Sequence, residues 1–141
     1  MLLIGVGNPD RGDDGAGPIV ASRLRLPEVE VRLARGEATE LLQLFSGRDR
    51  VYVVDAVVSG QAPGTLHRLD GHDLPGFMRS TSTHGLGLAE AVELARVLGS
   101  LPRELVVLGI EAADLTPGAV LSAPVSEAVD RLLPALEKEL G

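Results

Sequence analysis

The chain opens with the segment that decides its fold, an apolar run followed by a glycine-rich, acidic turn: Leu2-Leu3-Ile4-Gly5-Val6-Gly7-Asn8-Pro9-Asp10-Arg11-Gly12-Asp13-Asp14-Gly15-Ala16-Gly17-Pro18. Residues 2–6 are typical of a short buried strand, and residues 18–26 of the helix that follows it. Many α/β proteins bind an anion on such a turn, at the start of the helix. Here two adjacent carboxylates occupy that place, so the turn favours a metal over a phosphate.

The turn also lacks the pattern of a nucleotide-binding loop. That pattern, G-x-G-x-x-G, directs backbone N–H groups at a pyrophosphate, but Asp10 stands at the third glycine position. Asp13 and Asp14 would repel a phosphate strongly in a partly desolvated site. The simplest role for Asp13 is to cap the helix, as aspartate often does. Asp14 is then the carboxylate without a structural explanation.

Length and composition indicate one domain. The sequence has 141 residues, 45% of them hydrophobic, which is enough for one core and too little for two. We therefore assign residues 1–141 to a single α/β domain. The sequence contains no apolar run of about eighteen residues, and its start lacks the charged region and cleavage site of a signal peptide. These features predict a soluble, cytoplasmic protein.

Charge and residue usage narrow the classes of partner and site. A net charge of -7 opposes binding to nucleic acid or to an anionic membrane, because the field of the protein repels phosphate. Two phenylalanines, one tyrosine and no tryptophan leave almost no platform for base stacking. The absence of cysteine removes thiolate nucleophiles and cysteine-based metal sites. Any metal site must therefore use oxygen and nitrogen ligands.

Strands and helices alternate along the rest of the chain. The hydrophobic pattern predicts strands at residues 29–34, 51–54, 65–69 and 105–110, and helices at 37–45, 85–99 and 125–140. We expect the strand at 51–54 to be central, that at 65–69 to be an edge strand, and the last helix to bend or break at Pro134. The alternation predicts an α/β three-layer sandwich, a mostly parallel twisted sheet of about five strands with helices on both faces.

Polar residues gather at the carboxyl ends of the predicted strands, where open α/β sheets bind their ligands. They are Asp13 and Asp14 after the first strand, Asp55 after the third, His84 before the long helix and Glu111 after the last strand. Ser82 or Thr83 is expected to cap that helix. His67 and His72 lie in a polar stretch and are most simply solvated.

Two carboxylates and an imidazole without a thiol suit a borderline divalent ion such as nickel, zinc, cobalt or manganese. Three protein ligands would leave coordination positions for water or for a substrate. The same residues could instead perform general acid–base chemistry on a water molecule. The residue types alone leave both interpretations open.

Several motifs, in their order and spacing, resemble those of the nickel-iron hydrogenase maturation endopeptidases over essentially the whole chain. They are Gly5-Val6-Gly7-Asn8, Gly12-Asp13-Asp14-Gly15-Ala16-Gly17-Pro18, Val53-Val54-Asp55-Ala56, Thr83-His84-Gly85-Leu86-Gly87-Leu88 and Leu108-Gly109-Ile110. The resemblance implies a phosphorylase/hydrolase-like α/β domain that removes a C-terminal tail from a hydrogenase large-subunit precursor after nickel insertion. It also implies that Asp14, Asp55 and His84 are catalytic and contact nickel carried by the substrate.

One loop departs from the family pattern. Many members carry Asp-Gly-Gly after the second strand, whereas this chain has Ala34-Arg35-Gly36-Glu37. Either Glu37 replaces the missing aspartate, or this loop has lost its role in catalysis. Two other functions stay open. One is a non-catalytic nickel-binding or assembly chaperone on the same fold. The other is a peptidyl-tRNA hydrolase, because residues 4–9 resemble the opening of those enzymes; however, this chain lacks their Thr-Arg-His-Asn element, and its negative charge conflicts with an RNA substrate.

Overall fold

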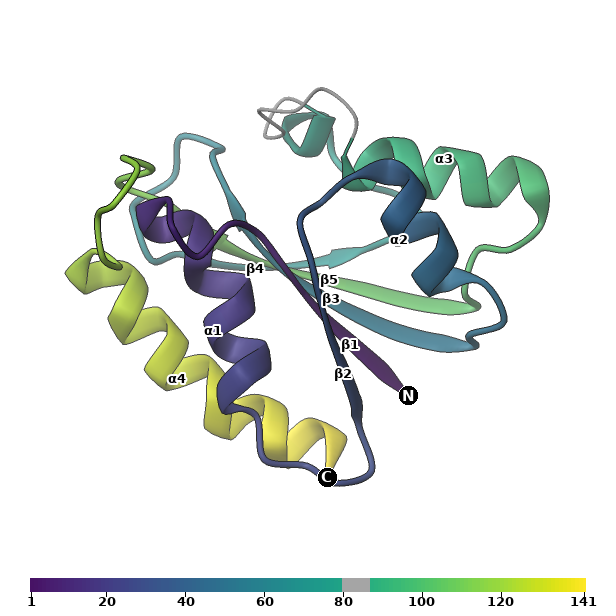
Figure 1. Cartoon of the computed structure of the whole chain (residues 1–141), viewed down its shortest axis with the longest axis horizontal. Helices are drawn as coiled ribbons and strands as arrows, with labels where there is room; N and C mark the ends of the chain where they lie inside the picture. Colours follow the sequence, from purple (N-terminus) through teal and green to yellow (C-terminus); the bar gives the residue numbers. More distant parts are fainter. Residues whose placement is uncertain (80–86) are drawn as a thin grey trace.

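The computed structural model describes residues 1–79 and 87–141. Five strands form one sheet in the order β2-β1-β3-β5-β4 (Figure 1). The parallel strands are β1 (Leu2–Val6), β2 (Glu30–Ala34), β3 (Arg50–Val57) and β5 (Glu104–Glu111), and β4 (Leu66–Asp70) pairs antiparallel with β5. The predicted central strand and the predicted edge strand are both confirmed.

Helices cover both faces of the sheet (Figure 1). The core on one face includes residues of α1 (Ala16–Arg23) and α4 (Ala123–Leu140), and the core on the other includes residues of α2 (Ala38–Phe45) and α3 (Leu88–Leu98). Two short 3-10 turns, η1 (Gly12–Gly15) and η2 (Gly76–Arg79), lie between the larger elements. The predicted α/β three-layer sandwich is confirmed.

The central strand shows how one segment serves both cores. Val51, Val53 and Val57 pack toward α2 and α3, while Tyr52 and Val54 pack toward α1 and α4, as the two-residue period of a strand requires. Asp55 stands between Val53 and Val57 in this alternation, so it belongs to the α2/α3 face of the sheet. An aspartate therefore replaces a core residue near the carboxyl end of the central strand.

Three predicted boundaries differ in the structure. β3 continues to Val57 because residues 55–57 pair with residues 109–111 of β5, so Asp55 lies inside the strand and not after it. Glu111 is likewise the last residue of β5. α4 runs without interruption through Pro134, and the buried Leu132, Leu133 and Leu136 hold it against the sheet on both sides of the proline.

The long helix begins later than predicted. α3 starts at Leu88, and the carboxylate of Glu90 accepts a hydrogen bond of 2.8 Å from the backbone N–H of Gly87. Of the predicted inward residues, Leu88, Val92 and Ala95 are buried, but Leu98 is largely exposed. The predicted caps Ser82 and Thr83 lie outside the described residues.

A glycine brings the first helix directly onto the sheet. A Cβ atom at Gly17 would come within 2.4 Å of the backbone oxygens of Val6 and Val54, so only glycine permits this approach. Since β2 and β3 flank β1 on opposite sides, the chain changes direction at β1, and open α/β sheets of this kind form their ligand crevice between the carboxyl ends of the two strands that meet at such a point, here β1 and β3. This crevice is where η1 is held.

Within residues 1–79 and 87–141, no helix combines the length and apolar character needed to cross a bilayer.

Candidate active site

Asp14 lies on η1, which follows β1 and precedes α1. Its Oδ2 accepts a hydrogen bond of 2.9 Å from the backbone N–H of Asn8, so the carboxylate is tied back to the start of the turn. Gly7 makes this fold of the turn possible, because it has φ of 143° and a Cβ there would lie 2.0 Å from the backbone oxygen of Asp14. The side chain is half-buried.

The neighbouring Asp13 has a structural role, but not the predicted one. Neither η1 nor α1 has a side-chain cap. Instead the fully buried Asp13 carboxylate accepts hydrogen bonds from the backbone N–H groups of Ala113, Asp114 and Ser122 and from the Ser122 hydroxyl, at 2.7 to 2.9 Å. It therefore fastens the glycine-rich turn to the loop between β5 and α4, which the sequence spacing gave no means to foresee.

Burial and hydrogen bonding act in opposite directions on Asp13. Burial by itself raises the pKa of its carboxyl, but the hydrogen bonds from Ser122, Asp114 and Ala113 outweigh it and hold the pKa below its ordinary value. Asp13 is thus an ionised anchor whose lone pairs are already used.

Asp55 has the opposite electrostatics. Burial raises the pKa of its carboxyl well above the usual range, and the negative charge of Asp14 raises it further; a hydrogen bond from Ala56 opposes them. The structure therefore brings the two predicted carboxylates of the site within electrostatic range of each other, from β3 and η1. A cation between them would relieve both the repulsion and the desolvation.

The third predicted residue, His84, lies outside the described residues. In the part of the chain that the structure describes, no group of three or more histidine, aspartate or glutamate side chains is arranged to hold a metal ion. The assignment of Asp14, Asp55 and His84 as catalytic and nickel-contacting residues stays a prediction.

Glu111 and His67 form a network that the sequence interpretation missed. His67 is not solvated as predicted: its side chain is only 15% exposed, and its Nε2 lies 2.9 Å from Oε1 of the Glu111 carboxylate. Glu111 also accepts hydrogen bonds from the N–H and the hydroxyl of Ser59, at 2.8 and 2.5 Å. The signal available in the sequence was a single acidic residue ending an apolar strand, which requires a partner when buried.

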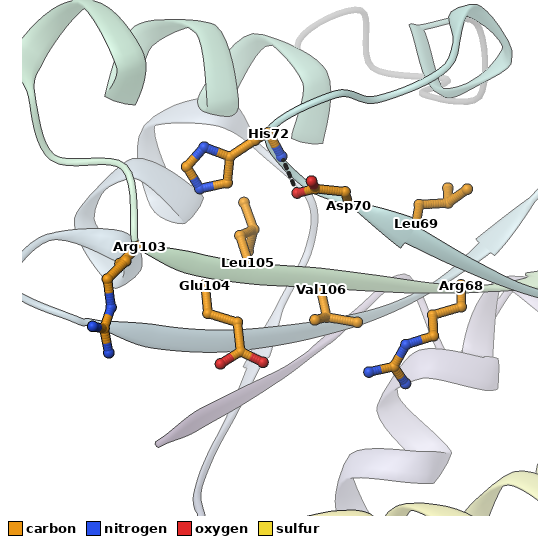
Figure 2. A pocket seen from close by; sticks show the side chains of 8 residues that line it. All are labelled: Arg68, Leu69, Asp70, His72, Arg103, Glu104, Leu105 and Val106. Atoms are coloured by element: carbon orange, nitrogen blue, oxygen red, sulfur yellow. Dashed lines mark hydrogen bonds between the residues drawn. The ribbon is translucent and has the colours of Figure 1, made fainter.

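His72 also differs from its predicted solvated state, since its Nε2 lies 2.8 Å from the backbone oxygen of Pro102. It borders a depression of about 480 Å³ at the end of β5 remote from the crevice (Figure 2). Three charged groups lining this depression form ion pairs, namely Arg68–Glu139, Arg103–Asp49 and Glu104–Arg50, and the Asp70 carboxylate accepts a hydrogen bond from the backbone N–H of His72. Its position and its pairing make it a structural feature, separate from the candidate site.

Glu37 stands at the N-cap position of α2, in the loop that departs from the family pattern. Its side chain is exposed, and it forms no hydrogen bond or ion pair with the residues that the structure describes. The adjacent backbone is fixed by another residue, because the Glu40 carboxylate accepts a hydrogen bond of 2.9 Å from the Arg35 N–H.

Comparison with known proteins agrees with the fold and the motifs. The sequence model of the hydrogenase maturation protease family (HycI) matches residues 22–139. The chain is 33% identical to the hydrogenase 2 maturation protease of Escherichia coli over 100% of this chain and 88% of that protein. It is 34% identical to a putative hydrogenase maturation protease of Methanocaldococcus jannaschii, over 100% and 94%.

A solved structure shares the same architecture. The hydrogenase maturating endopeptidase HybD of Escherichia coli superimposes with a TM-score of 0.80 at 29% identity, covering 98% of this chain and 92% of that one.

Proposed function

The chain belongs to the hydrogenase maturation protease family, whose members are peptidases, and we propose that it removes the C-terminal tail of a nickel-iron hydrogenase large-subunit precursor. In this proposal cleavage follows nickel insertion, and the enzyme recognises the nickel of its substrate through Asp14, Asp55 and His84. The nickel is cargo of the substrate, not a resident cofactor of the protease. Family membership favours the peptidase over the chaperone and the peptidyl-tRNA hydrolase.

The observation that carries the proposal is the electrostatic relation between Asp55 and Asp14. The raised pKa of Asp55, caused by burial and then by the charge of Asp14, marks two acids that oppose each other's ionisation. By contrast, Asp13 and Glu111 each receive several hydrogen bonds and have lowered pKa values. A divalent ion arriving with the substrate would offset the negative charge of these two acids.

The chemistry of the predicted ligands suits a transient ion better than a permanent one. A chain without cysteine offers only carboxylate and imidazole donors at this site, and three such ligands leave coordination positions for groups of the substrate. Binding of the ion would favour the ionised form of Asp55, because a carboxylate must be deprotonated to serve as a ligand. Docking of the ion on Asp14 and Asp55 would then position the scissile bond at the edge of the sheet.

The decisive experiment compares two forms of one precursor. Purified large-subunit precursor, loaded with nickel or free of it, is incubated with the protease, and tail removal is followed by intact-mass measurement. We expect cleavage of the loaded precursor and resistance of the nickel-free one, even with free nickel or zinc that occupies the protease but does not enter the precursor.

Two outcomes would contradict the proposal. Comparable cleavage of both precursors would mean that the substrate's nickel is not what the enzyme recognises. Tight binding of loaded precursor without any tail removal would indicate an assembly chaperone.

A further inference from the structure

A short segment after β5, residues 112–114, is fastened to the strand that carries Asp55. The backbone N–H of Ala112 donates a hydrogen bond of 2.9 Å to the backbone oxygen of Val57. Val57 lies two residues beyond Asp55, and both belong to the stretch of β3 that pairs with β5. The position of this segment is therefore set by the strand of Asp55.

The same segment is fastened to the turn that carries Asp14. The backbone N–H groups of Ala113 and Asp114 donate hydrogen bonds of 2.8 and 2.9 Å to Oδ2 of Asp13. In return the backbone N–H of Asp13 donates one of 2.8 Å to the Asp114 oxygen. Asp13 is the residue directly before Asp14 on η1. Residues 112–114 therefore bridge the two elements that carry the candidate acids, and we call them the bridge.

A glycine lets the turn and the loop after β5 approach backbone to backbone. Gly12 on η1 has φ of 56°, and a Cβ there would lie 2.4 Å from the backbone oxygen of Asp114. The N–H of Gly12 donates a hydrogen bond of 3.1 Å to the Ala119 oxygen, and the N–H of Gly118 donates one of 2.7 Å to the Asp10 oxygen. The turn is therefore held against this loop on both sides of the Asp13 contact.

The turn depends on this attachment for its position. A 3-10 turn of four residues has weak hydrogen-bond geometry of its own, and η1 has no side-chain cap. The hydrogen bond from Asn8 ties the Asp14 carboxylate to its own turn, so it does not set the distance from that turn to β3. When Asp14 and Asp55 are both ionised they repel each other, which would move an unattached turn away from the strand.

We propose that Asp13, through the bridge, is a positioning residue that fixes the separation of Asp14 from Asp55 for recognition of the substrate's nickel. The inference rests on the proposed function and adds to it a residue that acts without touching the ion. The Asp13 carboxylate accepts four hydrogen bonds, which occupy its oxygens, so it serves the site through Asp14 and not as a ligand. Loss of a group that holds metal ligands in place typically costs about 10- to 100-fold in affinity or activity.

Asp13→Asn tests this role, because it keeps the size of the side chain but turns one acceptor oxygen into a donor that faces backbone N–H groups. We expect nickel affinity to fall about tenfold. We expect kcat/KM for nickel-loaded precursor to fall about 10- to 100-fold, since a displacement of about 1 Å at a site that positions a substrate has effects of this size. Calorimetric titration and intact-mass kinetics measure the two quantities, at a temperature at which circular dichroism shows the variant folded.

Two control variants separate positioning from general damage. Asp130→Asn makes the same chemical change at an exposed residue of α4, where the carboxylate pairs with Arg23. Leu132→Ala removes a buried side chain of α4 and destabilises the fold without altering the bridge. Nickel affinity and kcat/KM of both controls should stay within about twofold of the unmodified protein, measured where each is folded.

A double-mutant cycle gives a readout that a merely structural role would not produce. If Asp13 acts through Asp14, Asp13→Asn should cost about tenfold in nickel affinity in the unmodified protein, but less than about twofold in the Asp14→Asn background. An equal loss in both backgrounds would make Asp13 an independent ligand. No loss in either background would leave it with a structural role alone, and both of these results overturn the inference.

A milder variant keeps the test decisive if Asp13→Asn does not fold. Ser122→Ala removes only the hydroxyl that donates a hydrogen bond of 2.8 Å to Oδ2 of Asp13, and it leaves the backbone donors in place. In the same cycle it should lower nickel affinity and kcat/KM about threefold, and only while Asp14 is present. Unchanged values in the folded Ser122→Ala protein, with Asp13→Asn unfolded, would count against positioning.

The outcomes for this inference and for the proposed function are distinguishable. If the unmodified protein cleaves loaded precursor, and Asp13→Asn retains more than a third of kcat/KM and of nickel affinity, the inference is wrong and the proposed function stands. If Asp13→Asn loses nickel affinity through Asp14 but the unmodified protein cleaves no precursor, the positioning role stands and the proposed function is wrong. An unmodified protein that binds no nickel would overturn the inference.

Discussion

Asp13 and Asp55 are carboxylates near the same edge of the sheet, and they differ in what surrounds them. Asp13 receives four hydrogen bonds from the loop between β5 and α4, and its pKa is lowered. Asp55 is half-buried in the central strand and faces the charge of Asp14, and its pKa is raised. The first environment stabilises an anion in place, whereas the second opposes ionisation of the acid. Adjacent or similar acidic residues in a motif therefore need not share a function.

The largest expected effect comes from neutralising the unsatisfied pair. Asp55→Asn and Asp14→Asn should each reduce cleavage of nickel-loaded precursor about 100-fold and weaken nickel binding about tenfold or more, by loss of a ligand. Calorimetric titration with nickel and intact-mass kinetics measure the two effects, with circular dichroism as the check on folding. Unchanged nickel affinity in both variants would remove Asp14 and Asp55 from the site, and His84→Ala applies the same test to the third predicted ligand.

Removing the satisfied carboxylate should instead damage the fold. Asp13→Ala leaves several buried N–H groups without acceptors and should lower the free energy of unfolding by about 3 kcal/mol, or roughly 10 °C in melting temperature. Thermal unfolding followed by circular dichroism measures this. Asp13→Asn, which keeps one acceptor oxygen, should lose less, and a melting temperature within about 2 °C of the unmodified protein for Asp13→Ala would contradict the anchoring role.

The pH dependence of stability should have opposite signs at the two residues. Because the pKa of Asp55 is raised, its stabilising contribution is present in acid and is lost as pH rises above its unfolded value of 3.8. Asp55→Asn should therefore gain stability over the unmodified protein with rising pH, by a few degrees at neutral pH.

For Asp13, whose pKa is lowered, the contribution is present above 3.8 and is lost as pH falls through the lowered value. The deficit of Asp13→Ala should accordingly shrink in acid. Melting curves from about pH 3 to 8 on both variants and the unmodified protein test whether the two pH dependences of stability have opposite signs. If the melting temperatures of both variants changed with pH in the same way, the two environments would be electrostatically equivalent.

The smallest expected effect concerns Glu37. Since its side chain is exposed and forms no ion pair with the described residues, Glu37→Gln should change the cleavage rate by no more than about twofold. Kinetics on nickel-loaded precursor measure it, with His72→Gln as a second surface control. A loss of tenfold or more would mean that Glu37 replaces the aspartate of the family loop.

The sequence by itself determined the architecture and pointed to the crevice. Apolar runs such as Val51-Tyr52-Val53-Val54 and the glycines of the first turn have steric and hydrophobic consequences that act locally, so strands, helices and their alternation could be predicted from them. The position of Asp14 and Asp55 at the carboxyl ends of neighbouring strands followed from the parallel sheet. The exact ends of the strands could not be predicted from the sequence, because pairing with β5 extends β3 past Asp55.

Only the tertiary structure decided what each polar side chain does. The partners of Asp13 are about a hundred residues away in the chain, and Ser59, His67 and Glu111 meet through the pairing of β3, β4 and β5. Sequence patterns report which residues favour burial, but hydrogen-bond satisfaction depends on which distant groups arrive at the same place. For that reason a histidine expected in solvent lies beside a buried glutamate, and one of two adjacent aspartates is an anchor while the charge of the other acts on Asp55.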